Sequence, residues 1–142
     1  MVFDPASAPR KRAAFLAWYE QQQSGDEDVP PSDDPRSLAP ALRAWFAEMI
    51  ETFPPLNGPL AKHENVDNPK ATDYGLGRTY VYACFGWSQA EEAREHTVRL
   101  AERHRVGLFN VSAHEGDVWV PGSRGKLEEL GDRNGLRRPG PP

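Results

Sequence analysis

Apolar residues recur along this chain at two spacings, one typical of helices and the other of strands. The clearest helical pattern has apolar positions every three or four residues, at Leu42, Trp45, Phe46, Met49, Ile50 and Phe53. Ser37 is suited to cap the start of this helix, and Pro54-Pro55 ends it. An earlier helix is predicted after Pro9, with Phe15, Trp18 and Tyr19 on one face.

Five apolar segments predict strands, two of them short, and they are Val2–Phe3, Asp73–Leu76, Thr79–Phe85, Val106–Ser112 and Gly116–Pro121. A third helix is predicted from Ser88 to Arg105, where Ser88 and Glu91 have the spacing of a capping box. The strand Thr79–Phe85 has no clean alternation of apolar and polar residues, so we expect it to be central or covered on both faces.

These elements predict one α+β domain over residues 1–121, in the order β-α-α-β-β-α-β-β. Its sheet is expected to be mainly antiparallel and covered by helices. Residues 122–142 are expected to form a C-terminal tail, with one turn around Lys126–Leu130 and a disordered stretch from Arg133 onward.

Composition narrows the class of protein. The chain has 142 residues, the usual size of one domain, and its net charge of −4 argues against nucleic-acid binding, which needs a basic face. Cys84 stands alone, so an intrachain disulfide and a cysteine metal cluster are excluded, and its apolar strand predicts a buried, inert thiol. No segment has the apolar length of a secretory signal or a membrane span, so we expect a cytoplasmic protein without membrane contact.

The acidic residues are concentrated in the loop of residues 24–36. Five carboxylates stand there against Arg36 alone, and they belong to Asp26, Glu27, Asp28, Asp33 and Asp34. A loop of this charge can meet a basic protein surface and speed association with it. A solvated acidic linker is the alternative interpretation.

A second long loop, residues 54–73, contains the densest group of ionisable side chains, with His63, Glu64, Asp67 and Asp73. Such side chains can bind a metal or act as general acids and bases. Their spacing is not that of a helical zinc motif, so a solvated loop is the simpler interpretation. Because loops of this length in compact domains are often functional, we also take these residues as candidates for partner binding.

The remaining candidates have structural explanations. Gly75 and Gly77 precede a strand, whereas a phosphate-binding glycine loop opens a helix. His96 and His104 lie two helical turns apart on one side of the predicted helix, and two histidines alone do not make a site, so we expect a surface or core-edge pair. Trp87 is near the end of an element, where aromatic residues can anchor an interface, although packing is the default expectation. The sequence thus indicates no catalytic residue, metal or cofactor.

Three segments resemble a group of small, mostly uncharacterised bacterial α+β proteins that are similar to toxin-immunity proteins. They are Ala41–Pro59, Trp87–Ala93 and Gly107–Ser112 within a similarity that spans about residues 2–120. The resemblance implies a bacterial protein that binds another protein, and it implies no catalytic residue.

We therefore expect a non-catalytic binding protein that neutralises a toxin by occluding it, with a basic toxin domain as partner. A flat acidic surface would favour this function. The alternative is a small-molecule-binding protein or enzyme with a site under the 54–73 loop, which an apolar pocket containing His63, Asp67 and Asp73 would favour. An extensive apolar patch would instead favour a structural subunit of an assembly.

Overall fold

The computed structural model describes residues 1–24, 34–111 and 117–130. Its helices are α1 (Arg12–Ser24), α2 (Pro40–Thr52) and α3 (Ala90–His104), with short 3-10 turns η1 (Pro35–Ser37), η2 (His63–Asn65) and η3 (Trp87–Gln89). Its strands are β1 (Val2–Phe3), β2 (Asp73–Leu76), β3 (Tyr80–Cys84), β4 (Gly107–Asn110), β5 (Asp117–Pro121) and β6 (Leu127–Glu129). None of the helices in these ranges is long and apolar enough to cross a bilayer.

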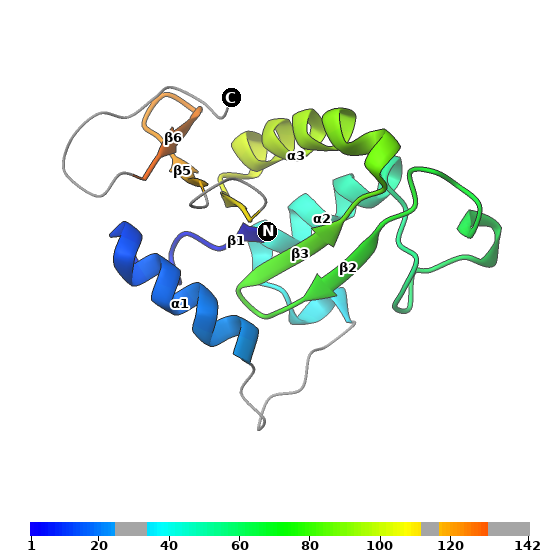
Figure 1. The fold of residues 1–142 in the computed structure, drawn as a ribbon, viewed down its shortest axis with the longest axis horizontal. Coiled ribbons are helices and arrows are strands. Elements are labelled where there is room, and N and C mark those ends of the chain that lie inside the picture. Colours follow the sequence, from blue (N-terminus) through cyan, green and yellow to red (C-terminus); the bar gives the residue numbers. More distant parts are fainter. Residues whose placement is uncertain (25–33, 112–116, 131–142) are drawn as a thin grey trace.

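Within these residues, six strands form one sheet in the order β2-β3-β1-β4-β5-β6 (Figure 1). Every neighbouring pair is antiparallel. The two-residue strand β1 lies inside the sheet, because Val2 pairs with both Val81 and Leu108. The predicted α+β class and antiparallel sheet are confirmed, with one strand more than the sequence indicated.

The additional strand is β6, which pairs with β5 where we expected an isolated turn around Lys126–Leu130. The spacing of the two leucines explains the error. Leu127 and Leu130 are three residues apart, as on one face of a helix, but in an extended chain this spacing places them on opposite faces. Leu127 is buried on the α2–α3 side of the sheet and Leu130 on the α1 side. The expectation of disorder from Arg133 onward concerns residues outside the described part of the chain.

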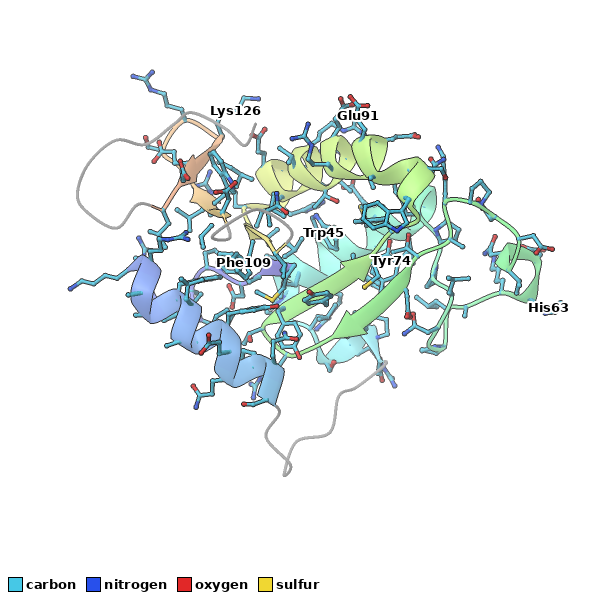
Figure 2. All side chains as sticks on the ribbon, viewed as in Figure 1. Trp45, His63, Tyr74, Glu91, Phe109 and Lys126 are labelled. Atoms are coloured by element: carbon cyan, nitrogen blue, oxygen red, sulfur yellow. The ribbon has the colours of Figure 1, made fainter. Side chains whose placement is uncertain are left out.

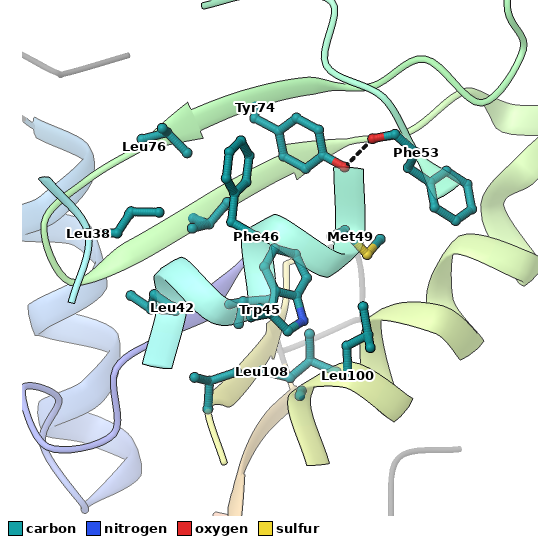
Figure 3. Close-up of a cluster of buried hydrophobic side chains, with 14 of the residues drawn as sticks. Leu38, Leu42, Trp45, Phe46, Met49, Phe53, Tyr74, Leu76, Leu100 and Leu108 are labelled. Atoms are coloured by element: carbon teal, nitrogen blue, oxygen red, sulfur yellow. Dashed lines mark hydrogen bonds between the residues drawn. The ribbon is translucent and has the colours of Figure 1, made fainter. Parts of the chain in front are cut away.

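The sheet has helices on both faces. The larger apolar cluster lies between the sheet and the pair α2 and α3, and it contains the buried stripe predicted for α2 (Figure 3). Trp45 is fully buried in this cluster, and its indole N–H donates to the carbonyl of Thr97 on α3 at 3.4 Å. On the opposite face, Phe15 of α1 packs against Phe3 and Phe109 of the sheet.

A polar contact also joins α2 to α3. The Glu48 carboxylate is 2.8 Å from Arg103 and 2.9 Å from the imidazole Nε2 of His104. His104 is therefore a core-edge residue, as its position in the sequence predicted. His96, two turns earlier, lies against the ring of Phe53 and is half-buried.

The predicted capping box is absent from the start of the third helix. The chain forms the turn η3 first, where the Gln89 N–H donates to the Gly86 carbonyl at 3.0 Å. Helix α3 then begins at Ala90, and the side chain of the preceding residue, Gln89, makes no capping bond. The residue before η3 is Gly86, which has no side chain to make one. Ser88 is thus inside the 3-10 turn and exposed, not at the helix N-cap.

Helix α1 covers only part of its face of the sheet. It packs mainly on β1, β4 and β5, through residues such as Phe3, Phe109 and Val118, and it meets β3 at Tyr80 and Tyr82. The alternate residues of β3 that point to this face are less well covered, and Cys84 at its end is exposed. The expectation of a buried thiol is therefore wrong, because a single helix does not extend over β2 and the end of β3. Of the two alternatives for this strand, the central position is confirmed, since β3 lies between β2 and β1.

Candidate binding surfaces

The loop of residues 54–72 is fixed to the outer edge of the sheet. The Thr72 N–H donates to the Pro54 carbonyl at 2.8 Å, and the Leu56 N–H donates to the Thr72 carbonyl at 2.9 Å. Asn57 continues this pairing with its side chain: Nδ2 donates to the Tyr74 carbonyl at 2.6 Å, and Oδ1 accepts from the Tyr74 N–H at 2.9 Å. These bonds satisfy edge groups of β2 that would otherwise be open to another strand.

Beyond Asn57 the loop presents both apolar and charged side chains to solvent. The exposed fractions are 46% for Leu56, 46% for Leu60 and 61% for Val66. Among the predicted site residues, His63, Glu64 and Asp67 are exposed, and His63 and Glu64 belong to η2. Figure 2 shows His63 at the outer end of this loop, away from the sheet.

Trp87 is the most exposed large apolar side chain among the described residues, with 97% of its surface accessible. Its backbone adjoins the 54–72 loop, because a Cβ added to Gly86 would lie 3.3 Å from the Pro69 carbonyl oxygen. An ion pair of 2.8 Å between Lys70 and Glu92 also joins the loop to the first turn of α3. The start of α3, which Trp87 precedes, lies at the end of the molecule from which the loop projects (Figure 1).

We call this region the loop–Trp87 surface and define it by its three most exposed apolar residues outside the edge pairing, Leu60, Val66 and Trp87. Its charged side chains carry both signs, because Lys62 is exposed in the same loop. Glu64 and Asp67 follow in the loop, and Glu91 points outward from α3 (Figure 2). The surface therefore combines an exposed tryptophan with charged side chains of both signs.

The acidic loop of residues 24–36 is described only at its end. Asp34 caps η1, and its carboxylate accepts bonds from the Arg36 side chain at 2.7 to 3.1 Å. These hydrogen bonds lower the pKa of Asp34 below its usual value. Asp34 is consequently engaged with the one arginine of the loop. Asp26, Glu27, Asp28 and Asp33 lie outside the described residues.

Asp73 is separated from the other predicted site residues, because it begins β2 and faces the side of the sheet that α1 covers only partly. An open hollow of about 320 Å³ lies there, lined by Gln23, Asp73, Tyr74, Gly75, Tyr80, Tyr82 and Cys84. His63 and Asp67 do not line it. In the described ranges no three His, Cys, Asp or Glu side chains are placed to hold a metal ion.

A crevice beside the 54–72 loop is much smaller. It has room for about 10 Å³ and is lined by Pro35, Phe46, Asn57, Gly58, Pro59, Leu60, Tyr74 and Leu76. This volume holds about one water molecule. The apolar pocket with His63, Asp67 and Asp73 that would favour a site under the loop does not correspond to either of these two spaces.

Tyr19 of α1 interacts with Tyr82 of β3 at the border of the larger hollow. Burial and a hydrogen bond with Tyr82 raise the pKa of Tyr19 to about 12. Tyr74 lies on the other face, where its hydroxyl donates to the Phe53 carbonyl at 2.7 Å, and burial raises its pKa as well (Figure 3). Both phenols therefore serve as hydrogen-bonding groups at neutral pH.

Sequence reasoning missed the role of Asn57 and the full exposure of Trp87. The position of Trp87 beside an element end was a signal for exposure, but it does not distinguish an exposed ring from one that packs against the first helical turn. Asn57 gave no signal, because its partner Tyr74 is 17 residues away along the chain.

No protein-family model matches this chain, and no curated protein or solved structure matches it either.

Proposed function

We propose that this chain binds another protein through the loop–Trp87 surface and that it acts as an immunity protein, neutralising a basic toxin domain by occluding it. The observation that carries the proposal is the 97% exposure of Trp87. A solvated tryptophan contributes no packing to its own fold, whereas tryptophan is among the residues that contribute most to binding energy when an interface buries it.

The fixed base of the loop supports this function. Backbone bonds at Thr72 and side-chain bonds at Asn57 hold the loop against β2 before any partner arrives. Ordering a loop costs free energy on association, and a loop that is already held avoids part of that cost. Leu60 and Val66 would then be presented together with Trp87 to the partner.

The charges support a basic partner. The chain has a net charge of −4, and the loop and α3 expose Glu64, Asp67 and Glu91 together with Lys62. Complementary charge raises the association rate and excludes acidic partners, while the buried aromatic anchor sets the dissociation rate. A basic toxin domain whose active cleft is covered by this surface would lose access to its substrate.

Coexpression tests the proposal. The protein domains encoded by the two reading frames next to this gene are each expressed in bacteria with and without this chain. We expect one of them to stop growth alone and to be tolerated with the wild-type chain. The Trp87→Ala variant should lose protection, and the control Val111→Ala, which removes an exposed side chain outside this surface, should keep it. If neither domain is toxic, or if both variants protect equally, the proposal is wrong.

A further inference from the structure

The hollow between the end of α1 and strands β2 and β3 has the size of a small-ligand site. Its volume of about 320 Å³ is near the lower end of the range for such sites, about 300–1,000 Å³. Gln23, near the end of α1, lies on its rim, and residues of β2 and β3 form the rest of its lining. The predicted partner residues His63 and Asp67 do not line the hollow.

The floor of the hollow combines an aromatic ring with a residue that has no side chain. Tyr82 pairs with Gly75 across the two strands. Side chains of paired residues share a face of the sheet, so the absence of a side chain at Gly75 leaves space beside the Tyr82 ring. Tyr82 also interacts with Tyr19 of α1. A flat group can therefore lie over Gly75 against Tyr82.

A carboxylate stands beside this floor. Asp73 is two residues before Gly75 on the same strand and face, and its side chain is exposed. Diagonal neighbours across two strands, such as Asp73 and Tyr82, are about 7–8 Å apart, which a small molecule spans. Among the described residues no Lys, Arg or His forms an ion pair with Asp73. The carboxylate is thus available to a cation that enters the hollow.

We infer that this hollow binds a small organic cation with a planar group, which lies over Gly75 against Tyr82 while its charge pairs with Asp73. Aromatic faces and carboxylates both attract organic cations, and the partly enclosed hollow strengthens the two attractions. Tyr80 also lines the site. Its ring occupies the space that a side chain at Gly77 would need. The inference does not depend on the proposed function, because it uses a different face of the molecule.

Benzamidine and benzamide test the inference as a matched pair, because they have the same size and planarity and differ in charge. Binding is followed by amide chemical shifts of the folded protein. We expect benzamidine to shift the resonances of residues 73–84 and benzamide to have little effect. Asp73→Asn should weaken benzamidine binding about tenfold. Asp67→Asn removes an exposed carboxylate outside the hollow and should leave the affinity unchanged.

Cys84 supplies a second readout that needs no substitution, because the thiol is exposed and lines the hollow. Saturating benzamidine should slow its alkylation by iodoacetamide, a neutral reagent, and benzamide should not. The inference is overturned if benzamide binds as well as benzamidine, if Asp73→Asn keeps full affinity while folded, or if Cys84 is not protected. None of these results would bear on toxin neutralisation by the loop–Trp87 surface.

Discussion

The side chain of Asn57 pairs with the backbone of Tyr74 through two hydrogen bonds of 2.6 and 2.9 Å, as a neighbouring strand would. Tyr74 is in β2, the edge strand of the sheet, and the pairing continues the backbone bonds made by Thr72. One amide therefore closes part of the sheet edge and holds the 54–72 loop in place. The next residue, Gly58, has a φ of 79°, which favours glycine and lets the chain turn away from the strand.

The Asn57→Ala substitution should lower the free energy of unfolding by about 1–3 kcal/mol, because it leaves two backbone groups of a partly buried strand edge without partners. A urea titration measures this as a lower midpoint with an unchanged slope. Asn68→Ala is the matched control, since Asn68 also bonds to backbone in this loop but is exposed. Equal losses for the two variants would show that Asn57 has no special role at the edge.

Replacing Ser88 with alanine should change stability by less than about 0.5 kcal/mol, as is usual for an exposed residue without a structural bond. Replacing a helix N-cap residue with alanine would instead lower the stability by about 1 kcal/mol. The structure predicts the smaller value, because Ser88 lies within η3 and is exposed. Thermal or urea denaturation distinguishes the two values, and a loss near 1 kcal/mol would restore the capping box that the sequence suggested.

His96 makes stability depend on pH. Burial, followed by the nearby Arg99, lowers the pKa of His96 below its usual value of 6.5. The unfolded chain therefore takes up a proton at a higher pH than the folded chain does. As the pH falls from about 7 through 6.5 and toward the lowered pKa, protonation stabilises the unfolded state, and the free energy of unfolding decreases.

The free energy of unfolding, measured in urea between pH 5 and 8, tests this direction. His96→Gln should reduce the dependence without abolishing it, because burial also lowers the pKa of the Met1 ammonium to about 5. His63→Gln should keep the full dependence, because His63 is exposed on η2. A wild-type protein that becomes more stable as the pH falls through this range would contradict the direction of the pKa shift.

The spacing of apolar residues was sufficient to predict the elements that bury one face. The stripe of α2, with Trp45 and Met49 fully buried, follows from spacing alone, because burial of one helical face requires it. β6 was missed because Leu127 and Leu130 have a helical spacing, whereas in the extended chain they lie on opposite faces of the sheet. The exposure of Cys84 was missed for a different reason, since it depends on how far α1 extends over the sheet, which no local pattern encodes.

The candidate site was predictable only in part. A long loop with His63, Glu64 and Asp67 was evident from the sequence, and the structure exposes all three. Asp73 is on a different surface, because it starts a strand whose alternation turns it toward the α1 side. Trp87 could be recognised as a candidate anchor, but its exposure follows from the turn η3, which the sequence had suggested as a capped helix start.

The acidic residues of the 24–36 loop should affect the rate of partner binding more than its strength. Changing Asp26, Glu27, Asp28, Asp33 and Asp34 to their amides should slow association with a basic partner and flatten the dependence of the rate on salt. The dissociation rate should change little, because the anchor is the loop–Trp87 surface. Stopped-flow rates over a salt series measure both quantities, and equal association rates for the two proteins would remove this loop from the encounter.

The affinity of the Trp87→Ala variant for the toxin domain tests the central claim most directly. Titration calorimetry with the purified domain should give a dissociation constant about 30-fold or more above that of the wild-type chain, as for an aromatic anchor at the centre of an interface. Val111→Ala should bind like the wild type, and both variants should unfold at the wild-type urea concentration, because each side chain is exposed. An affinity for Trp87→Ala within twofold of the wild type would contradict a contact surface centred on Trp87.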